Sequence, residues 1–334
     1  MKIQKKIARK LVFPVLMKLG VDVLLRNRAK NSILNVMYHG VVSNDSCYFS
    51  PRHINLKQFE QQLKYYKKNF TIITCEEAFK KLSHKEKLSQ KYLTISFDDG
   101  YKNNLTTALP LLEKYNIPTT FFISSICAIN NEMNYLWSET IAALNYFYKD
   151  GAVKINNLVL KKLKNENISI TDYIKSLPYE ERDEVLHQIE KKYNLKAKIE
   201  SLPEEVWKLL NPNEVIELSK SAIATIGSHG HNHFNLSQIE PKAALEELRS
   251  SKELLSELIK SEINLIAYPD GSYNSVVKNI SKELKYTGQF AVDYKLSDDH
   301  TDLKIMNRHG ISSTTNFYSN MLSLNLAFKK KGNN

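Results

Sequence analysis

Short apolar runs alternate with amphipathic stretches along most of the chain. The runs that predict strands are Ile33–Tyr38, Phe70–Thr74, Tyr92–Phe97, Thr119–Ser124, Ala222–Gly227, Ile263–Tyr268, Gln289–Val292 and Lys304–Arg308. Most are followed by apolar residues at helical spacing, as at Leu56, Phe59, Leu63 and Tyr66. Repeated strand–helix units indicate a parallel sheet, and about eight such strands predict a closed or nearly closed β/α barrel.

The predicted helices carry start signals and one break. Asn55 is the expected N-cap of the first helix, and Gln58 three residues later completes a variant of the capping box. Pro110 disfavours an uninterrupted helix over Asn104–Tyr115. The other predicted helices cover Glu76–Leu82, Glu240–Lys260, Ser275–Leu284 and Asn316–Phe328.

The alternation lapses from about residue 130 to residue 211, where the sequence is charged and helix-forming, for example at Glu180–Tyr193. We interpret 130–211 as a helical insertion in a single catalytic domain that covers residues 31–330. The chain has 334 residues, of which 42% are hydrophobic, and this is enough for one large α/β domain.

Residues 1–30 are predicted to form a separate basic, amphipathic segment. They hold nine Lys and Arg residues against the single acid Asp22, and the whole chain carries a formal charge of +11. Leu11–Leu25 is apolar but is broken by Pro14 and Lys18, so it is too short to span a bilayer. The segment therefore lies either on an anionic membrane or on the surface of its own domain. A nucleic-acid partner is disfavoured, because no arginine-rich helix or aromatic RNA-binding signature is present.

The cysteines indicate the kind of cellular compartment in which the protein is expected. Cys47, Cys75 and Cys127 are far apart and odd in number, so they form no disulfide framework, and a reducing compartment is expected. The expected location is the cytoplasm, peripheral at the inner face of the membrane. Export is the alternative, because a basic start before an apolar stretch imitates a signal peptide, although no cleavage site follows.

Polar residues cluster directly after five of the predicted strands. The clusters are Tyr38-His39, Asp98-Asp99-Gly100, Ser228–His233, Pro269-Asp270-Gly271 and Arg308-His309. In a β/α barrel the C-terminal ends of all strands meet at one mouth, where active sites lie. We therefore expect these clusters to converge in space.

The spacing within two clusters indicates a metal site. His229 and His233 stand four residues apart, and the Asp98–Asp99 pair can supply a carboxylate ligand. Two imidazoles and one carboxylate, with open positions, suit a catalytic divalent metal rather than a closed structural zinc. Taken singly, Asp-Asp-Gly is more often a plain turn, and a His-rich loop can simply be solvated.

The motifs resemble those of a known family. Ser96–Tyr101 (SFDDGY) resembles the first motif of the polysaccharide deacetylases, the carbohydrate esterases with the NodB homology domain. Gly227–His233 (GSHGHNH) resembles their second motif and Ala267–Gly271 (AYPDG) their third. Val36–His39 (VMYH) is similar to the branch that includes the poly-N-acetylglucosamine deacetylases. The resemblance runs over residues 33–310 without the insertion, and it implies a distorted (β/α) barrel of the polysaccharide-deacetylase type.

The resemblance implies roles for the matching positions. Asp98 matches the catalytic base, and Asp99, His229 and His233 match the metal triad. His231 matches no ligand of the family and is assigned either to the loop or to the residues that surround the ligands. The expected cofactor is one divalent ion, with zinc first, and no organic cofactor is implied, since no glycine-rich phosphate loop precedes a helix.

Two histidines are candidates for the general acid. His39 is the candidate that the branch implies, and His309 is its rival. The family's third motif has an Arg that orients the base and a Tyr whose backbone N–H holds the oxyanion, but this chain has Ala267 and Asp270 there. The residues expected to contact substrate are Tyr101, Tyr268, Pro269, Asp270, Arg308 and His309.

These roles imply a metal-dependent hydrolase that removes N-acetyl groups from amino sugars of a polysaccharide or glycan intermediate. The expected partner is an N-acetylated glycan, with peripheral contact to an anionic membrane and no nucleic acid. Three alternatives stay open. One is a deformylase or esterase on a related glycan, another a non-catalytic carbohydrate-binding relative. The third is a basic adaptor for membranes or nucleic acid.

Overall fold

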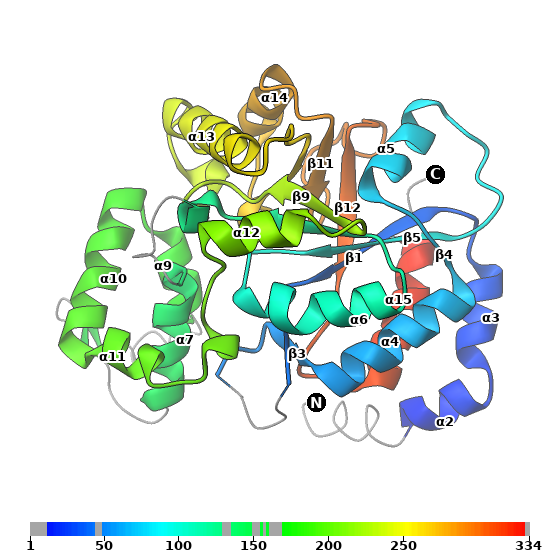
Figure 1. The fold of residues 1–334 in the computed structure, drawn as a ribbon, viewed down its shortest axis with the longest axis horizontal. Coiled ribbons are helices and arrows are strands. Elements are labelled where there is room, and N and C mark those ends of the chain that lie inside the picture. The colour runs from blue at the N-terminus through cyan, green and yellow to red at the C-terminus, as the bar shows by residue number, and fades with distance from the viewer. Residues whose placement is uncertain are drawn as a thin grey trace.

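A ring of parallel strands forms the centre of the molecule (Figure 1). The computed structural model describes residues 12–43, 49–128, 135–148, 154–155, 158–159 and 169–330. Within them the strands of the ring are β1 (Ile33–Tyr38), β12 (Ile305–Gly310), β11 (Gly288–Ala291), β10 (Leu265–Ala267), β9 (Ala224–Ser228), β6 (Thr119–Ile123) and β5 (Tyr92–Phe97), in that order. The predicted barrel fold is confirmed.

Strand β1 closes the ring because it pairs on both sides. Ile33–Tyr38 is in parallel register with Tyr92–Phe97 of β5, and Asn35–Met37 with Arg308–Gly310 of β12. The sequence predicted about eight strands, and the eighth, β4 (Thr71–Ile72), pairs only with the first half of β5 and stays outside the ring. The second half of β5 pairs with β6, so β4 and β6 share one edge.

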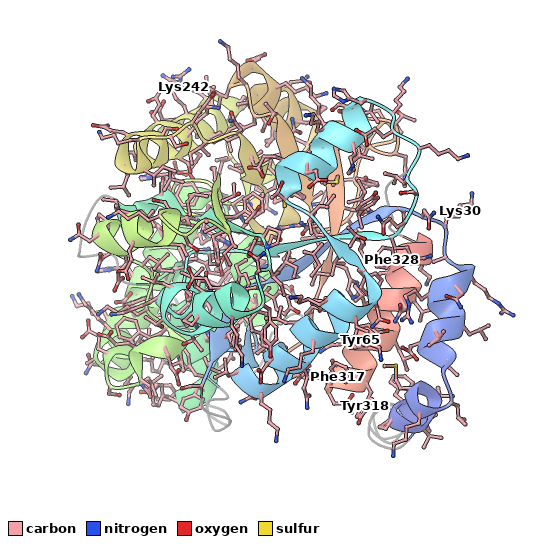
Figure 2. The ribbon with its side chains drawn as sticks, turned by 45° about the vertical axis from the view of Figure 1, so that its right-hand side comes forward. Lys30, Tyr65, Lys242, Phe317, Tyr318 and Phe328 are labelled. Carbon is pink, nitrogen blue, oxygen red and sulfur yellow. The ribbon has the colours of Figure 1, made fainter. Side chains whose placement is uncertain are left out.

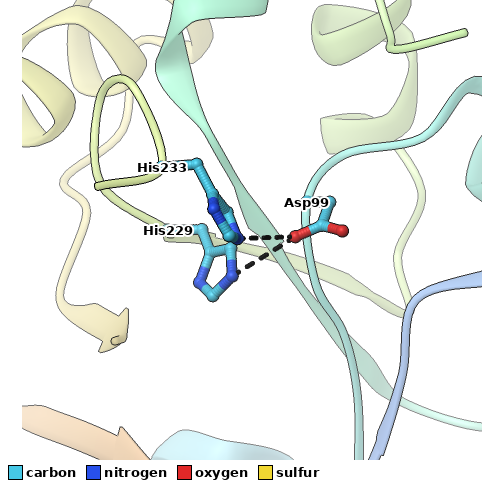
Figure 3. A group of neighbouring side chains, drawn as sticks. All are labelled: Asp99, His229 and His233. Atoms are coloured by element: carbon cyan, nitrogen blue, oxygen red, sulfur yellow. Dashed lines mark ion pairs between the residues drawn. The ribbon is translucent and has the colours of Figure 1, made fainter. Parts of the chain in front are cut away.

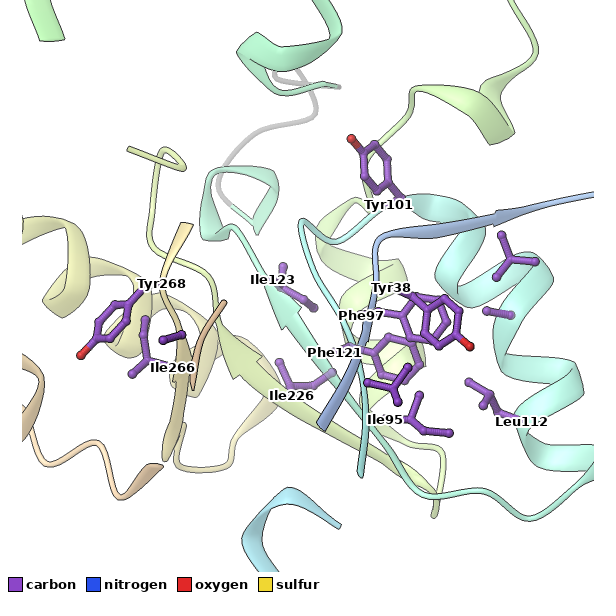
Figure 4. Close-up of a cluster of buried hydrophobic side chains, with 14 of the residues drawn as sticks. Tyr38, Ile95, Phe97, Tyr101, Leu112, Phe121, Ile123, Ile226, Ile266 and Tyr268 are labelled. Atoms are coloured by element: carbon purple, nitrogen blue, oxygen red, sulfur yellow. The ribbon is translucent and has the colours of Figure 1, made fainter. Parts of the chain in front are cut away.

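The strands alternate between an inner and an outer face, and this alternation positions the chemistry. Tyr38, Phe97 and Phe121 stack against one another, with ring centroids 5.3 and 5.4 Å apart (Figure 4), and Phe59 from a helix outside the barrel packs edge-on against Tyr38 and Phe97. The neighbouring Ser96 therefore points into the barrel, where its hydroxyl donates to Asn35 Oδ1 at 2.8 Å.

Helices cover the outside of the ring. They are α4 (Leu56–Asn69), α5 (Cys75–Ser83), α6 (Leu109–Lys114), α12 (Pro212–Ser219), α13 (Pro241–Ile259), α14 (Ser275–Glu283) and α15 (Phe317–Lys330). Asn55 caps α4 as predicted, and its side chain accepts from the backbone N–H groups of Lys57 and Gln58. The Gln58 amide nitrogen donates to the Thr315 carbonyl at 2.9 Å. A complete capping box that the sequence analysis did not identify joins Asn211 and Glu214 at the start of α12.

Pro110 divides the predicted helix over Asn104–Tyr115. Asn104–Ala108 winds as a π-helix, and α6 starts at Leu109, which places Pro110 in the first turn. Proline is tolerated there because the first N–H groups of a helix have no intrahelical partner.

Between β6 and β9 the chain leaves the barrel and forms its own helical layer, drawn in green in Figure 1. The described helices of this layer are α7 (Trp137–Phe147), α9 (Ile170–Ser176), α10 (Tyr179–Tyr193) and α11 (Leu195–Glu200). They bury a hydrophobic cluster distinct from the barrel core, with Ile174, Ile189 and Leu195 almost fully buried. At the other end of the molecule, α2 (Phe13–Lys18) and α3 (Val21–Arg28) lie beside α15.

Candidate active site

The polar clusters that follow the strands meet at one pocket of about 380 Å³. His39 follows β1, Asp98 and Asp99 follow β5, and His229 and His233 follow β9. Asp270, after β10, and Arg308, in β12, line the same pocket. The structure therefore brings together seven of the residues that the sequence singled out.

Asp99, His229 and His233 form the innermost group (Figure 3). The Nε2 atoms of His229 and His233 lie 3.4 and 3.2 Å from Oδ1 of Asp99. Ligand atoms of the three residues lie within 4.8 Å of one another, and all three side chains are buried.

The local backbone explains how residues four apart share one point. His229 directly follows strand β9, and the chain then turns through Gly230 with φ +73° and His233 with φ +56°. Asp99 also has a positive φ of +77°. A non-glycine residue in this region is strained, and such strain concentrates at functional sites. The turn brings His233 back beside His229, with ring centroids 5.0 Å apart.

Glu247 of α13 holds this turn, and the sequence analysis did not identify it. Its Oε2 accepts from the backbone N–H groups of His231 and Asn232 at 3.1 and 2.9 Å, and its Oε1 accepts from the Asn232 side chain at 2.6 Å. The carboxylate is buried, with 6% of the residue exposed. His231 lies outside the triad, and its Nδ1 is 2.8 Å from the Ser125 hydroxyl.

These donor atoms fit a divalent cation. His229 Nδ1 is 2.8 Å from the Ala267 carbonyl, which can only accept, so this nitrogen carries the proton and Nε2 presents a lone pair. That lone pair faces Asp99 Oδ1, a buried acceptor with no hydrogen-bond partner. Two hydrogen-bond acceptors that face one another in a buried site repel each other. A cation bound between them would remove this unfavourable electrostatic energy.

Arg308 holds the predicted base, Asp98. The Arg308 guanidinium donates to Asp98 Oδ1 at 2.6 Å, and Asp98 Oδ2 lies 3.8 Å from His229 Nε2. Burial raises the pKa of Asp98, but the charge and hydrogen bond of Arg308, together with the charges of His229 and His39, outweigh it, and the pKa is lowered. Arg308 was predicted to contact substrate. It is fully buried and bonded to the base, so β12 supplies the orienting arginine that is missing at Ala267.

The two candidate acids lie on different faces of their strands. His39 is half-buried and lines the pocket, and burial lowers its pKa against the opposing charges of Asp99 and Asp98. His309 follows Arg308 directly in β12, and successive residues of a strand point to opposite faces. Arg308 points into the pocket, and His309 is not among the residues that line it.

Three of the predicted substrate contacts are corrected by the structure. Tyr101 and Tyr268 are fully buried, and their hydroxyls donate to Glu139 at 2.6 Å and to Gln289 at 2.8 Å. Pro269 is buried as well, and none of the three lines the pocket. Large apolar side chains next to strand ends pack beneath the mouth loops, and the motif pattern does not distinguish this from exposure.

Other residues at the pocket come from the insertion, and no sequence motif indicated them. The Trp137 indole N–H donates to the His233 carbonyl at 3.4 Å. Lys175 of α9 forms an ion pair with Asp270 at 2.5 Å. Arg52, which also lines the pocket, is paired with the buried Glu139 of α7. The insertion is thus fastened to the barrel at the rim of the pocket.

Comparison with known proteins agrees with this geometry. The profile of the family described as Polysaccharide deacetylase matches residues 85–289. The protein YxkH of Bacillus subtilis (strain 168), which carries the name of a polysaccharide deacetylase, is 35% identical over 89 residues. That match spans 26% of this chain and only 30% of the length of YxkH.

Two solved structures share the fold. IcaB from Ammonifex degensii superposes with a TM-score of 0.57 at 15% identity, over 89% of this chain and 98% of that chain. The deacetylase PplD from Streptococcus pyogenes, solved in complex with acetate, gives a TM-score of 0.52 at 20% identity, over 87% and 97%. The profile match covers more than half of the chain and includes Asp98, Asp99, His229 and His233. The chain therefore belongs to the polysaccharide deacetylase family.

Proposed function

We propose that this protein is a metal-dependent hydrolase that removes N-acetyl groups from amino sugars of a glycan. The observation that carries the proposal is the buried triad Asp99–His229–His233 directly beside Asp98, which Arg308 keeps ionised. A set of two imidazoles and one carboxylate is typical of catalytic zinc, so we propose zinc as the ion.

Asp99 and the two histidines would hold the ion, which when bound lowers the pKa of a water molecule and polarises the acetamide carbonyl. Asp98 accepts the proton of the attacking water, and its bond to Arg308 fixes the orientation of the carboxylate. His39 protonates the departing nitrogen as the C–N bond breaks. Water and the amide are consumed, and acetate and a free amino sugar are formed.

The oxyanion needs a donor besides the ion. Asp270 stands where the family has a tyrosine whose backbone N–H serves this purpose, and a backbone N–H is unchanged by the side chain. The Asp270 carboxylate lies in the pocket wall and is paired with Lys175, so we propose that this pair contacts polar groups of the sugar.

The test uses purified full-length protein, N-acetylated glucosamine oligomers and two variants of the same loop. His233→Ala should lose both zinc, measured by elemental analysis, and acetate release. His231→Ala is the matched control, because His231 bonds to Ser125 outside the triad, and it should keep both. Unchanged zinc content in His233→Ala would refute the triad. Release of formate from a formylated analogue, with no acetate from the acetylated oligomers, would make the protein a deformylase. Zinc binding with neither acid released would indicate a non-catalytic relative.

A further inference from the structure

Apolar side chains are concentrated on the outside of α2 and α3. Among the described residues, seven large hydrophobic side chains are exposed, and five of them lie between positions 12 and 24. These five are Val12 at 46%, Val15 at 53%, Leu19 at 74%, Val23 at 43% and Leu24 at 48%. The first three recur at spacings of three and four, which places them on one side of α2. Such concentration on a folded protein marks an interaction site.

The opposite side of these helices is fixed to the body of the protein. Asp22 is 6% exposed and accepts from the Tyr65 hydroxyl at 2.9 Å, and Arg26 donates to that hydroxyl at 2.9 Å. Asn325 of α15 donates to the same oxygen at 2.9 Å, and Met17 packs against the barrel core. The helices are therefore docked in one orientation, with their apolar side chains turned outward.

Exposed basic side chains lie close in sequence to the apolar ones. Lys18, Arg28 and Lys30 are exposed, and the only acid in the first 30 residues is the buried Asp22. The ten residues at the start of the chain add five more Lys and Arg residues in sequence.

A hollow of about 410 Å³ lies on the same side of the molecule, between α4 and α15. Its walls are Gln61, Lys64, Tyr65, Lys68, Phe317 and Tyr318. Figure 2 shows Tyr65, Phe317 and Tyr318 next to α2 and α3, whereas Lys30 lies beyond the C-terminal end of α3. Lys64 forms an ion pair with Glu60 at 3.4 Å, whereas Lys68 is exposed at the rim. Aromatic rings and lysines are the side chains that favour the boundary between lipid headgroups and acyl chains.

We propose that this docking surface, made of the five apolar residues of α2 and α3 with Lys18, Arg28, Lys30 and the adjacent hollow, binds the surface of an anionic lipid bilayer. The apolar side chains enter the headgroup region, and the basic side chains meet the negative lipids. None of the described helices is long and apolar enough to cross a membrane, so contact through these helices is peripheral. The basic residues of the docking surface favour an anionic lipid surface over an apolar protein partner.

The experiment is cosedimentation of the full chain with vesicles of phosphatidylcholine alone or with added phosphatidylglycerol. Wild type should sediment with the anionic vesicles and be released by high salt. The double variant Val15→Asn with Leu19→Asn and the double variant Lys18→Glu with Lys30→Glu should each bind roughly tenfold more weakly, since each removes one of the two forces.

Two control variants each carry one substitution of the same kind outside the docking surface. Val276→Asn replaces an exposed apolar residue on α14, 42% exposed, and Lys242→Glu reverses a charge on α13, far from the docking surface in Figure 2. Both should bind like wild type, and circular dichroism should show all variants folded. Equal binding by docking-surface and control variants would overturn the proposal. So would concentration-dependent dimerisation that the apolar variant abolishes while lipid binding is absent, because a second copy would then be the occupant.

Discussion

Arg308 has the largest effect of the charged neighbours that lower the pKa of Asp98, and this makes it a positioning residue for the proposed base. The guanidinium is buried over the Phe122 ring, 5.7 Å from its centroid, and donates to the carboxylate at 2.6 Å. An arginine that is paired and buried in this way fixes both the orientation and the protonation state of its partner. Replacing Arg308 with an uncharged residue should therefore change the protonation of Asp98 without changing metal binding.

We predict that Arg308→Met keeps the metal and moves the acidic limb of the kcat/KM profile to higher pH. The sign follows from the structure: Arg308 lowers the pKa of Asp98, so removing it lets burial raise that pKa, and the base becomes protonated at a higher pH. Arg308→Lys, which retains a charge, should shift the limb less. An unmoved acidic limb in Arg308→Met would show that Asp98 is not the group being titrated.

The second residue-scale prediction concerns the acid. His39→Ala should be nearly inactive with its metal content intact, whereas His309→Ala should keep much of the rate, because only His39 lines the pocket. His39→Ala should also lose the alkaline limb of the pH–rate profile, which reports the essential acid. If the losses are found the other way round, His309 is the acid and His39 is structural.

At the scale of single residues, the sequence identified candidate chemical groups that the structure brings together, but not how deeply each side chain is buried. Asp98, Asp99, His229 and His233 belong to motifs with a fixed spacing, and the structure places them together. Tyr101 and other residues near strand ends were misassigned, because burial depends on side chains from distant segments. The Asp98–Arg308 bond joins positions 210 residues apart, and no local pattern reports such a contact.

At the scale of elements, the turn from His229 to His233 depends on α13. One carboxylate, Glu247, accepts three hydrogen bonds from this turn and is the side chain from α13 that fixes the backbone at His231 and Asn232. A helix is a stiff support, so a residue on it positions a loop more accurately than another loop residue could.

We predict that Glu247→Gln weakens zinc binding by about tenfold or more, the range found for groups that support metal ligands. The side-chain NH2 group introduced at position 247 would face the side-chain NH2 group of Asn232, so two hydrogen-bond donors would oppose each other. The second change Asn232→Asp should restore much of the affinity, because the donor and acceptor are then exchanged between the same two positions. Zinc affinity is measured by competition with a chromophoric chelator. A double variant that binds no better than Glu247→Gln would show that the pair does not position the turn.

Element prediction succeeded where local periodicity determines the structure. The runs at Ile33–Tyr38 and Tyr92–Phe97 are β1 and β5 to the residue. The run at Phe70–Thr74 formed only the two-residue β4, because a strand needs a free neighbour, and β6 occupies the rest of that edge. The order of strands around the ring likewise depends on long-range pairing.

At the scale of the whole molecule, the active-site pocket lies between two hydrophobic cores. The barrel supplies the candidate ligands, base and acid, and α7 and α9 supply the opposite wall through Trp137, Ile141 and Lys175. The wall is tied to the barrel by the Arg52–Glu139 and Lys175–Asp270 ion pairs. The sequence predicted helices in the insertion but gave no signal that they would face the candidate metal site.

We predict that loosening the second core changes substrate binding more than metal binding. Ile189→Ala on α10, a residue 1% exposed in that core, should cost ~2–5 kcal/mol of local stability and raise KM, with zinc affinity little changed. Leu255→Ala on α13, fully buried in the barrel core, is a truncation of the same kind and should lower the melting temperature with a smaller effect on KM. Equal KM changes would mean that the insertion wall does not contact the substrate.

The closure of the ring by β1 also bears on how the protein is made. β1 precedes every other strand of the ring and its partner β5 is the next one synthesised, but its other neighbour, β12, is synthesised only after the insertion and four more strands of the ring. Until then one edge of β1 presents unpaired N–H and C=O groups, which invite pairing with other chains. The same delay applies to α15, the support for α2 and α3. On the ribosome, the barrel and the docking surface are therefore completed only after β12 and α15 have been synthesised.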